Sequence, residues 1–173
     1  TDSFVPAPAF TSTPANPTNQ TSAAFSFTDA EPGVHFFCQL DGTEFSPCTS
    51  PMTYPGLLTQ GSHAFSVMAE DALGNRSSVT VFLWAIDTTP PPTPLITAAP
   101  NNVTKQTKAT FRFTDLEAGV SFACQLDDGV PAACSSPRSY SGLRAGSHTF
   151  SVWAQDIAGN QSGPARFTWS IVP

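Results

Sequence analysis

The sequence is poor in basic residues and lacks long apolar runs. Its 173 residues include only 7 Lys and Arg, scattered along the chain, against 13 Asp and Glu, so the formal net charge is −6. A nucleic-acid backbone would be repelled by this charge, and a nucleic-acid partner is not expected. The longest apolar stretches, such as residues 79–86, are far shorter than the roughly 20 residues that cross a bilayer, so no membrane insertion is expected.

The start of the chain also lacks a leader. No basic segment with an apolar core and a small-residue cleavage site begins at Thr1. Thr1 is therefore interpreted as the start of an excised fragment or of a mature chain.

Cysteine is present in an ordered way. Cys38 and Cys48 form one pair and Cys124 and Cys134 a second, each with nine residues between its members. Matched pairs of this kind predict one local disulfide per pair, formed in an oxidising compartment. The alternative is that the four are buried apolar residues of a cytosolic protein. A zinc site is not expected, because no close second ligand pair accompanies either spacing, and no cofactor is predicted.

Four N-x-S/T sequons offer a second indication of the compartment. They begin at Asn19, Asn75, Asn102 and Asn160, and none has proline in the middle. In a eukaryotic source they predict a glycoprotein of the secretory route, whereas a bacterial source would leave them unmodified.

The chain repeats itself. The segment FSFTDAEPGVHFFCQLDG aligns with FRFTDLEAGVSFACQLDD, which places Phe25 on Phe111 and Cys38 on Cys124. Further on, GSHAFSVMAEDALGN aligns with GSHTFSVWAQDIAGN, and Trp84 aligns with Trp169. Between the copies lies the proline-rich segment TTPPPTP, which favours an extended, semi-stiff spacer. The sequence therefore predicts domain 1 over residues 1–87, a linker over 88–94 and domain 2 over 95–173.

Each copy has the pattern of β-strands. Apolar residues alternate with period two, as in Val34, Phe36, Cys38 and Leu40, and no segment sustains a helical period. Such short strands, punctuated by DG, PG, GS and GN turns, predict an all-β, antiparallel, two-sheet sandwich. The predicted core also holds Phe25, Phe27, Phe65, Val67, Ala69, Phe82, Trp84 and Ile86 with their matches in the second copy.

The joint motif of each copy resembles a known family. It runs C-Q-L-D, then C-x-S-P-x-x-Y-x-G-L, then G-S-H-x-F-S-V-x-A-x-D-x-x-G-N, and ends on a late Trp. This resembles the bacterial immunoglobulin-like domain repeat, and similar repeats occur in extracellular proteins of green algae. The resemblance implies two tandem Ig-like sandwiches, cut from a longer array on a secreted or surface protein, that act as stalk or adhesive modules without catalysis.

One departure from the family pattern predicts an interaction patch. Where the family often has a polar residue after F-S-V, this chain has Met68 and Trp153, both predicted to point outward. In the first copy Phe37, Val81 and Leu83 are apolar on the same outward phase. We expect an exposed apolar patch around Met68 that contacts a protein partner or a neighbouring repeat; cover by a neighbouring segment is the alternative.

Neither the histidines nor the acidic turns predict an enzyme. His63 and His148 recur at matched positions on the inward phase, which favours a structural role, and His35 is matched by Ser121. The motifs at Asp71–Asn75 and Asp156–Asn160 are typical of hairpin turns.

An alternative interpretation is that the acidic loops form a metal site. In it Asp115 and Glu117, with Asp156 and the linker's Asp87, hold calcium between the domains.

Two classes of function remain open at this stage. The favoured one is a non-catalytic extracellular module of a surface stalk, fibre or adhesin that mediates protein contacts. The other is an accessory or carbohydrate-binding module of a secreted enzyme. Trp153, Tyr54 and Tyr140 are the aromatic candidates for a glycan platform, although both tyrosines are expected to be packed.

Overall fold

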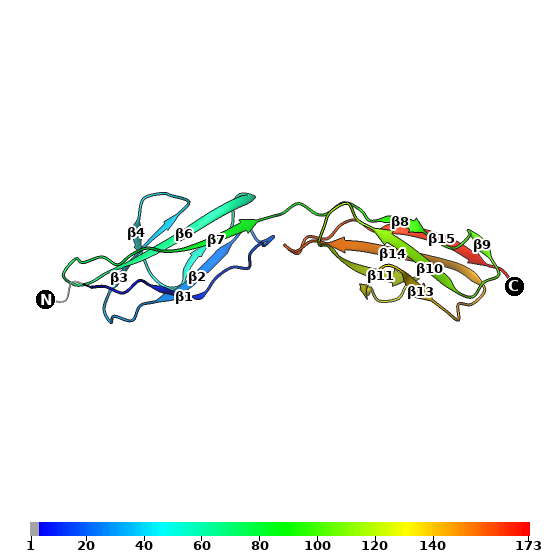
Figure 1. Ribbon diagram of the computed structural model, residues 1–173, viewed down its shortest axis with the longest axis horizontal. Coiled ribbons are helices and arrows are strands. Elements are labelled where there is room, and N and C mark those ends of the chain that lie inside the picture. The colour runs from blue at the N-terminus through cyan, green and yellow to red at the C-terminus, as the bar shows by residue number, and fades with distance from the viewer. Residues whose placement is uncertain (1–3) are drawn as a thin grey trace. The chain divides into compact units, whose positions relative to one another are not determined.

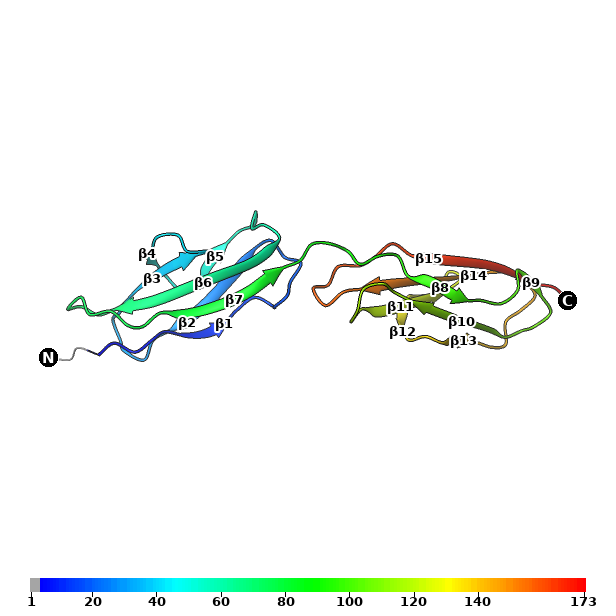
Figure 2. The ribbon, with the colours of Figure 1, turned by 45° about the horizontal axis from the view of Figure 1, so that its top comes forward.

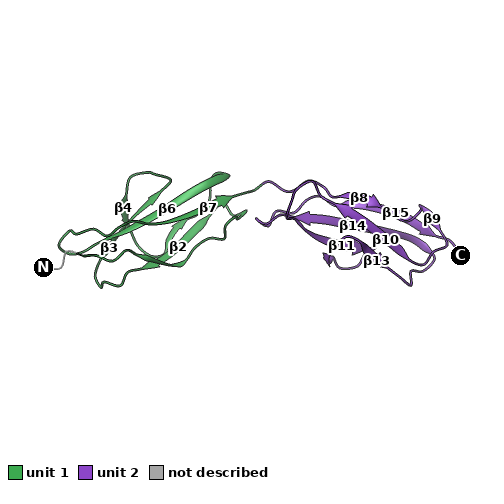
Figure 3. Ribbon diagram, in the orientation of Figure 1, with its two compact units in different colours: residues 1–88 green, residues 89–173 purple. Residues whose placement is uncertain are grey.

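The computed structural model describes residues 4–173, and every regular element in that range is a β-strand (Figure 1; Figure 2). The chain divides into two compact units, Thr1–Thr88 and Thr89–Pro173 (Figure 3). Residues 4–173 include no helix long and apolar enough to cross a membrane.

Unit 1 is a sandwich of two antiparallel sheets. One sheet has the order β1-β2-β5, made of β1 (Ala9–Ser12), β2 (Ala23–Thr28) and β5 (Met52–Tyr54). The other has the order β4-β3-β6-β7, made of β4 (Ser46–Cys48), β3 (His35–Leu40), β6 (Gly61–Glu70) and β7 (Thr80–Ile86). The prediction of an antiparallel sandwich is confirmed for this copy.

Unit 2 repeats the arrangement with one addition. Its first sheet has the order β13-β10-β8, from β8 (Leu95–Ala98), β10 (Ala109–Thr114) and β13 (Arg138–Tyr140). Its second has the order β12-β11-β14-β15-β9, from β9 (Val103–Thr104), β11 (Ser121–Leu126), β12 (Ala132–Cys134), β14 (Gly146–Gln155) and β15 (Ala165–Ile171). The short β9 runs parallel to β15, and Thr18 makes the corresponding parallel bridge to Ile86 in unit 1.

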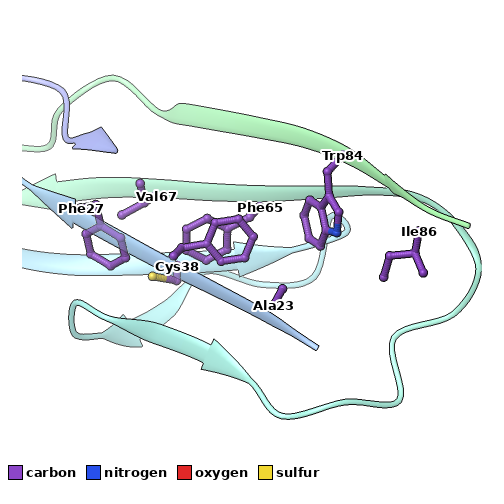
Figure 4. Close-up of a cluster of buried hydrophobic side chains, with 8 residues drawn as sticks. Ala23, Phe27, Cys38, Phe65, Val67, Trp84 and Ile86 are labelled. Carbon is purple, nitrogen blue, oxygen red and sulfur yellow. The ribbon is translucent and has the colours of Figure 1, made fainter. Parts of the chain in front are cut away.

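The core of each unit lies between its two sheets, on the faces that the alternation predicts. In unit 1 every second residue of β2 is buried, Phe65 and Val67 of β6 belong to the same core, and Trp84 and Ile86 of β7 close one end of it (Figure 4). Phe36, Leu40 and Phe82 pack against this core and are partly buried, and unit 2 has the same set at matched positions.

Two stacked phenylalanines join the sheets. The rings of Phe25 on β2 and Phe65 on β6 lie 4.0 Å apart between centroids at an interplanar angle of 11°, and Trp84 meets Phe25 at 5.2 Å. Phe111 and Phe150 of unit 2 stack with the same separation and angle. Because aromatic rings bury large areas, these contacts supply a substantial part of a small core.

All four cysteines form the predicted disulfides. Cys38 of β3 is bonded to Cys48 of β4, and Cys124 of β11 to Cys134 of β12, each across ten positions of sequence. The alternative of unpaired apolar cysteines is therefore wrong. In each unit the bond fixes a three-residue edge strand to the strand beside it.

Removing one staple should weaken one domain. We expect the double substitution Cys124→Ala with Cys134→Ala to lower the free energy of unfolding of unit 2 by about 2–3 kcal/mol, because closing a loop of about 10 residues restricts the unfolded chain by that amount. Calorimetry should show one of two transitions moving to lower temperature. An unchanged thermogram would contradict the stabilising role, and the matched Cys38/Cys48 variant should move the other transition.

Candidate interaction surfaces and polar clusters

The outward face of the larger sheet in unit 1 differs from its prediction. Strand register places Pro47, Phe37 and Met68 in a row across β4, β3 and β6. The guanidinium carbon of Arg76 lies 5.3 Å from the centre of the Phe37 ring, and Arg76 Nε pairs with Glu70 Oε2 at 2.6 Å.

Met68 is buried, with 7% of its surface exposed. Phe37 is half-buried. The predicted exposed patch around Met68 is therefore wrong. On the same face, the turn after β6 brings Arg76 over the ring of Phe37, with which it makes a cation–π contact.

In the larger sheet of unit 1, apolar exposure is found along β7. Val81 is 51% exposed and Leu83 is 66% exposed, and Val79, just before the strand, is 45% exposed. All three lie at the edge of the sheet, since β6 is the only strand of residues 4–173 that pairs with β7, and the bridge from Thr18 meets β7 at Ile86. The predicted residues Val81 and Leu83 are thus at the surface, on an edge strand and not around Met68.

The backbone of β7 is only partly covered along that edge. Asn16 accepts a hydrogen bond from Ala85 N at 3.0 Å and donates from Nδ2 to Leu83 O at 3.3 Å, and Thr18 N donates to Ala85 O at 3.0 Å. These bonds show that odd-numbered residues of β7 direct their N–H and C=O groups away from β6. The N–H and C=O of Val81 face this edge beyond the bonds of Asn16.

The matching strand of unit 2 has polar side chains where β7 has apolar ones. Val81 and Leu83 correspond to Arg166 and Thr168, which are exposed and polar. The end of β15 is paired with β9, where Ser170 N donates to Asn102 O at 2.8 Å. A charge on an edge strand opposes pairing with another strand, so the two copies differ at this edge.

Trp153 belongs to unit 2, whereas Val81 and Leu83 of β7 belong to unit 1. The residues of the predicted patch are therefore divided between the two units. Trp153 is half-buried on the outward face of β14, opposite Ala123 of β11. Tyr54 and Tyr140 pack against the cores of their units, as expected.

A histidine clamp closes one end of each sandwich. His63 is 7% exposed; its Nδ1 lies 2.7 Å from Asp41 Oδ2 and its Nε2 lies 2.7 Å from Thr59 O. The other oxygen of Asp41 accepts a bond from Ala64 N at 2.8 Å, so this carboxylate ties the turn after β3 to β6. His148, Asp127 and Arg144 O repeat the clamp in unit 2 at 2.8 and 2.9 Å.

Both ring nitrogens of each clamp face acceptors, so the bonds are complete only for the charged imidazolium. Burial lowers the pKa of His63, but the bonds to Thr59 O and Asp41 outweigh burial and raise it above its ordinary 6.5. In His148 the bond to Arg144 O and then the bond to Asp127 raise the pKa. The clamps are structural, as the inward phase of the histidines predicts.

The acidic turns after β6 and β14 are closed by their own side chains. Oδ1 of Asp71 accepts bonds from Leu73 N and Asn75 N, both at 2.8 Å, and its Oδ2 accepts from Asn75 Nδ2 at 2.8 Å. The bond from the Asn75 side chain is the largest cause that lowers the pKa of Asp71. Burial raises the pKa of Asp156, but bonds from Asn160 and from the turn's backbone together lower it.

The acidic residues of unit 2 that are predicted to bind calcium are held by local hydrogen bonds. Within residues 4–173, no three His, Cys, Asp or Glu side chains come together in a group that could hold a metal ion. Asp115 Oδ1 accepts a bond from Glu117 N at 2.9 Å, and Asp156 binds Asn160. Asp115 Oδ2 is buried without a partner, and Asp87 belongs to unit 1. Calcium at these four residues stays a prediction.

The four sequon asparagines lie in different surroundings. Asn102 is exposed and Asn19 is half-buried. Asn75 and Asn160 donate through Nδ2 to Asp71 and Asp156, and Asn160 is 9% exposed.

The two sandwiches define a repeat of immunoglobulin-like or fibronectin type III-like domains. No protein-family model matches the sequence, and no curated protein matches it. Among solved structures, the fibronectin(III)-like modules of Clostridium thermocellum CbhA superpose with a TM-score of 0.58 at 18% identity, covering 95% of this chain and 93% of theirs. The FN1–FN3 domains of chicken CNTN1 give a TM-score of 0.54 at 12% identity, covering 100% of this chain and 67% of theirs. These likenesses establish the fold.

The histidine clamps predict a pH dependence of stability. Their contribution should be complete below pH 6.5, the ordinary pKa that histidine regains on unfolding, and should be lost as the pH rises through the higher folded-state pKa. We expect the melting temperature to fall as the pH rises from 6.5 through the higher folded-state pKa of the two histidines. The variant His63→Gln with His148→Gln should flatten this profile, and an equal fall in the variant would exclude the clamps as its source.

Glycan occupancy should follow side-chain accessibility. When the protein is secreted from a eukaryotic host, we expect a glycan on Asn102 and none on Asn160, because a glycan on Asn160 Nδ2 would displace its bond to Asp156 in a buried turn. Peptide mass spectrometry measures the occupancy. A folded product glycosylated at Asn160 would contradict this expectation.

Proposed function

We propose that this chain is a non-catalytic extracellular structural module, a pair of domains from a longer surface or fibre protein, which makes a protein contact through the edge of β7. The observation that carries the proposal is the exposed edge of unit 1 at Val79, Val81 and Leu83. An open, apolar edge strand is a template for pairing with another strand.

The edge is suited to a second copy of the same chain. An antiparallel pair of β7 strands related by a two-fold axis at Val81 would let the two Val81 residues exchange backbone hydrogen bonds. The same register would set Val79 opposite Leu83 of the other copy, so apolar side chains would pair on one face. Asn16 limits the ladder to these few residues, so a weak contact is expected, as suits repeated modules that act together.

The polar clusters support a structural role. His63 and His148 use both ring nitrogens, and Asp71 and Asp156 use both carboxylate oxygens, to hold loops of their own domain. A general base or nucleophile needs a group free to reach a substrate. These side chains serve the scaffold instead.

The two disulfides support an extracellular location. A disulfide in each domain is typical of extracellular proteins, because the cytosol keeps thiols reduced. The exposed sequon at Asn102 is consistent with the same environment in a eukaryotic source.

Transplanting the edge of unit 2 onto unit 1 tests the contact. The substitutions Val81→Arg and Leu83→Thr install the residues that unit 2 has at these positions, so the sandwich should fold normally. Sedimentation velocity across a concentration series should show reversible self-association of the parent chain and a monomer for the variant.

The matched control reverses the exchange. Arg166→Val with Thr168→Leu should strengthen self-association, because it gives unit 2 the apolar edge of unit 1. A parent chain that stays monomeric at millimolar concentration, or a Val81→Arg/Leu83→Thr variant that associates equally well, would refute the contact through β7.

A second candidate function, an accessory glycan-binding module of a secreted enzyme, is favoured by a separate observation. A depression beside Trp153 in unit 2 is lined by side chains that suit a small, polar, ring-shaped ligand. It is independent of the β7 edge.

A further inference from the structure

A small hollow beside Trp153 opens on the outward face of unit 2. The strand register aligns Ala133, Ala123 and Trp153 across β12, β11 and β14, which is the row that Pro47, Phe37 and Met68 occupy in unit 1. Because alanine is small at both neighbouring positions, the flank of the Trp153 side chain borders a depression of about 170 Å³.

Unit 1 has larger side chains than alanine at the two positions beside Met68. In unit 1 Phe37 stands beside Met68, which is buried, and Arg76 lies over the Phe37 ring while pairing with Glu70. Unit 1 also has a groove of about 510 Å³, but it lies between β3 and β4, with Phe37, Pro47 and Thr49 in its lining, and it does not reach Met68.

Neutral hydrogen-bonding groups surround the hollow in unit 2. The Glu70–Arg76 ion pair of unit 1 is replaced by Gln155 and Gln161, which face each other across a backbone bridge. Ser121, whose hydroxyl donates a 3.4 Å bond to Gln155 O, also lines the hollow, together with the apolar Phe122 and Ala154. Both glutamines are exposed, and Gln155 makes only a 3.3 Å bond from Nε2 to Gly159 O. Each amide offers a donor and an acceptor, and the serine hydroxyl can act as either.

We infer that this hollow binds one ring of a neutral saccharide, and that Trp153 is its stacking platform. An indole face accepts the C–H face of a pyranose, while two amides and a hydroxyl match the hydroxyl groups at the ring's rim. No charged side chain lines the hollow, so an uncharged sugar is favoured over an acidic one. Its volume suits one sugar ring, and affinity therefore depends on Trp153 more than on any other residue.

The inference gives a ligand class to the second candidate function, and its failure would leave the contact through β7 untouched, because the two sites share no residue. Trp153 is also a clean probe. Trp84 and Trp169 are buried, at 2% and 1% exposure, so only the indole of Trp153 can meet a ligand directly.

Titration of the full chain with cellohexaose and with mannohexaose tests the site, followed in NMR spectra by the indole N–H resonances and by the backbone amide resonances of the residues around the hollow, which also report on binding by variants that lack Trp153. We expect the Trp153 resonance to move saturably with at least one of the two, while those of Trp84 and Trp169 stay in place. Hexagalacturonate, an anionic oligosaccharide, should bind more weakly. Trp153→Met, which installs the residue of unit 1, should weaken binding by at least about fivefold.

A second variant keeps the tryptophan and fills the space. Ala123→Phe installs the counterpart of Phe37 and should also weaken binding, with the melting temperature showing that both variants are folded. Three results would overturn the inference: no movement of the Trp153 resonance with either neutral hexamer, equal binding by Trp153→Met, or tighter binding of hexagalacturonate or of a proline-rich peptide than of the neutral sugars.

Discussion

The stacked rings of Phe25 and Phe65 connect the two sheets of unit 1, and Phe111 and Phe150 do so in unit 2 with the same separation. A domain of this size buries only about 60–65% of its unfolded surface, so a few aromatic contacts decide whether the sheets stay packed. Once they are packed, the inward phase of β3, β6 and β7 is set, and the outward phase follows. The candidate surfaces on β7 and β14 therefore exist because the rings behind them hold the strands in register.

Much of this fold follows from the sequence. Alternation predicts the buried faces because a strand exposes every second side chain to the core, and the repeat predicts that Trp84 and Trp169 play the same part. Alternation does not predict what covers an outward residue. Met68 is on the predicted face, yet it is buried, and the neighbouring Phe37 is capped by Arg76, which comes from a turn whose path no periodicity describes.

The candidate sites were partly predictable for the same reason. Val81 and Leu83 could be recognised as outward and apolar, but the open backbone at Val81 depends on where Asn16 pairs with β7, and this pairing involves residues 67 and 69 positions apart. Likewise Trp153 could be recognised as a candidate aromatic. The hollow beside it arises from Ala123 and Ala133 on two other strands, a neighbourhood that only the strand register discloses.

The locality of the disulfides has a consequence for how such domains can be multiplied. Four cysteines admit three pairings, and the chain uses the one in which each cysteine joins its nearest partner in sequence. Neighbouring copies with almost the same core are prone to exchange strands while they fold. The disulfide closes a short loop within one copy. It keeps β3 beside β4 in unit 1 and β11 beside β12 in unit 2. A gene encoding this repeat can therefore be lengthened by duplication, because each added copy closes its own disulfide and this limits strand exchange with neighbouring copies.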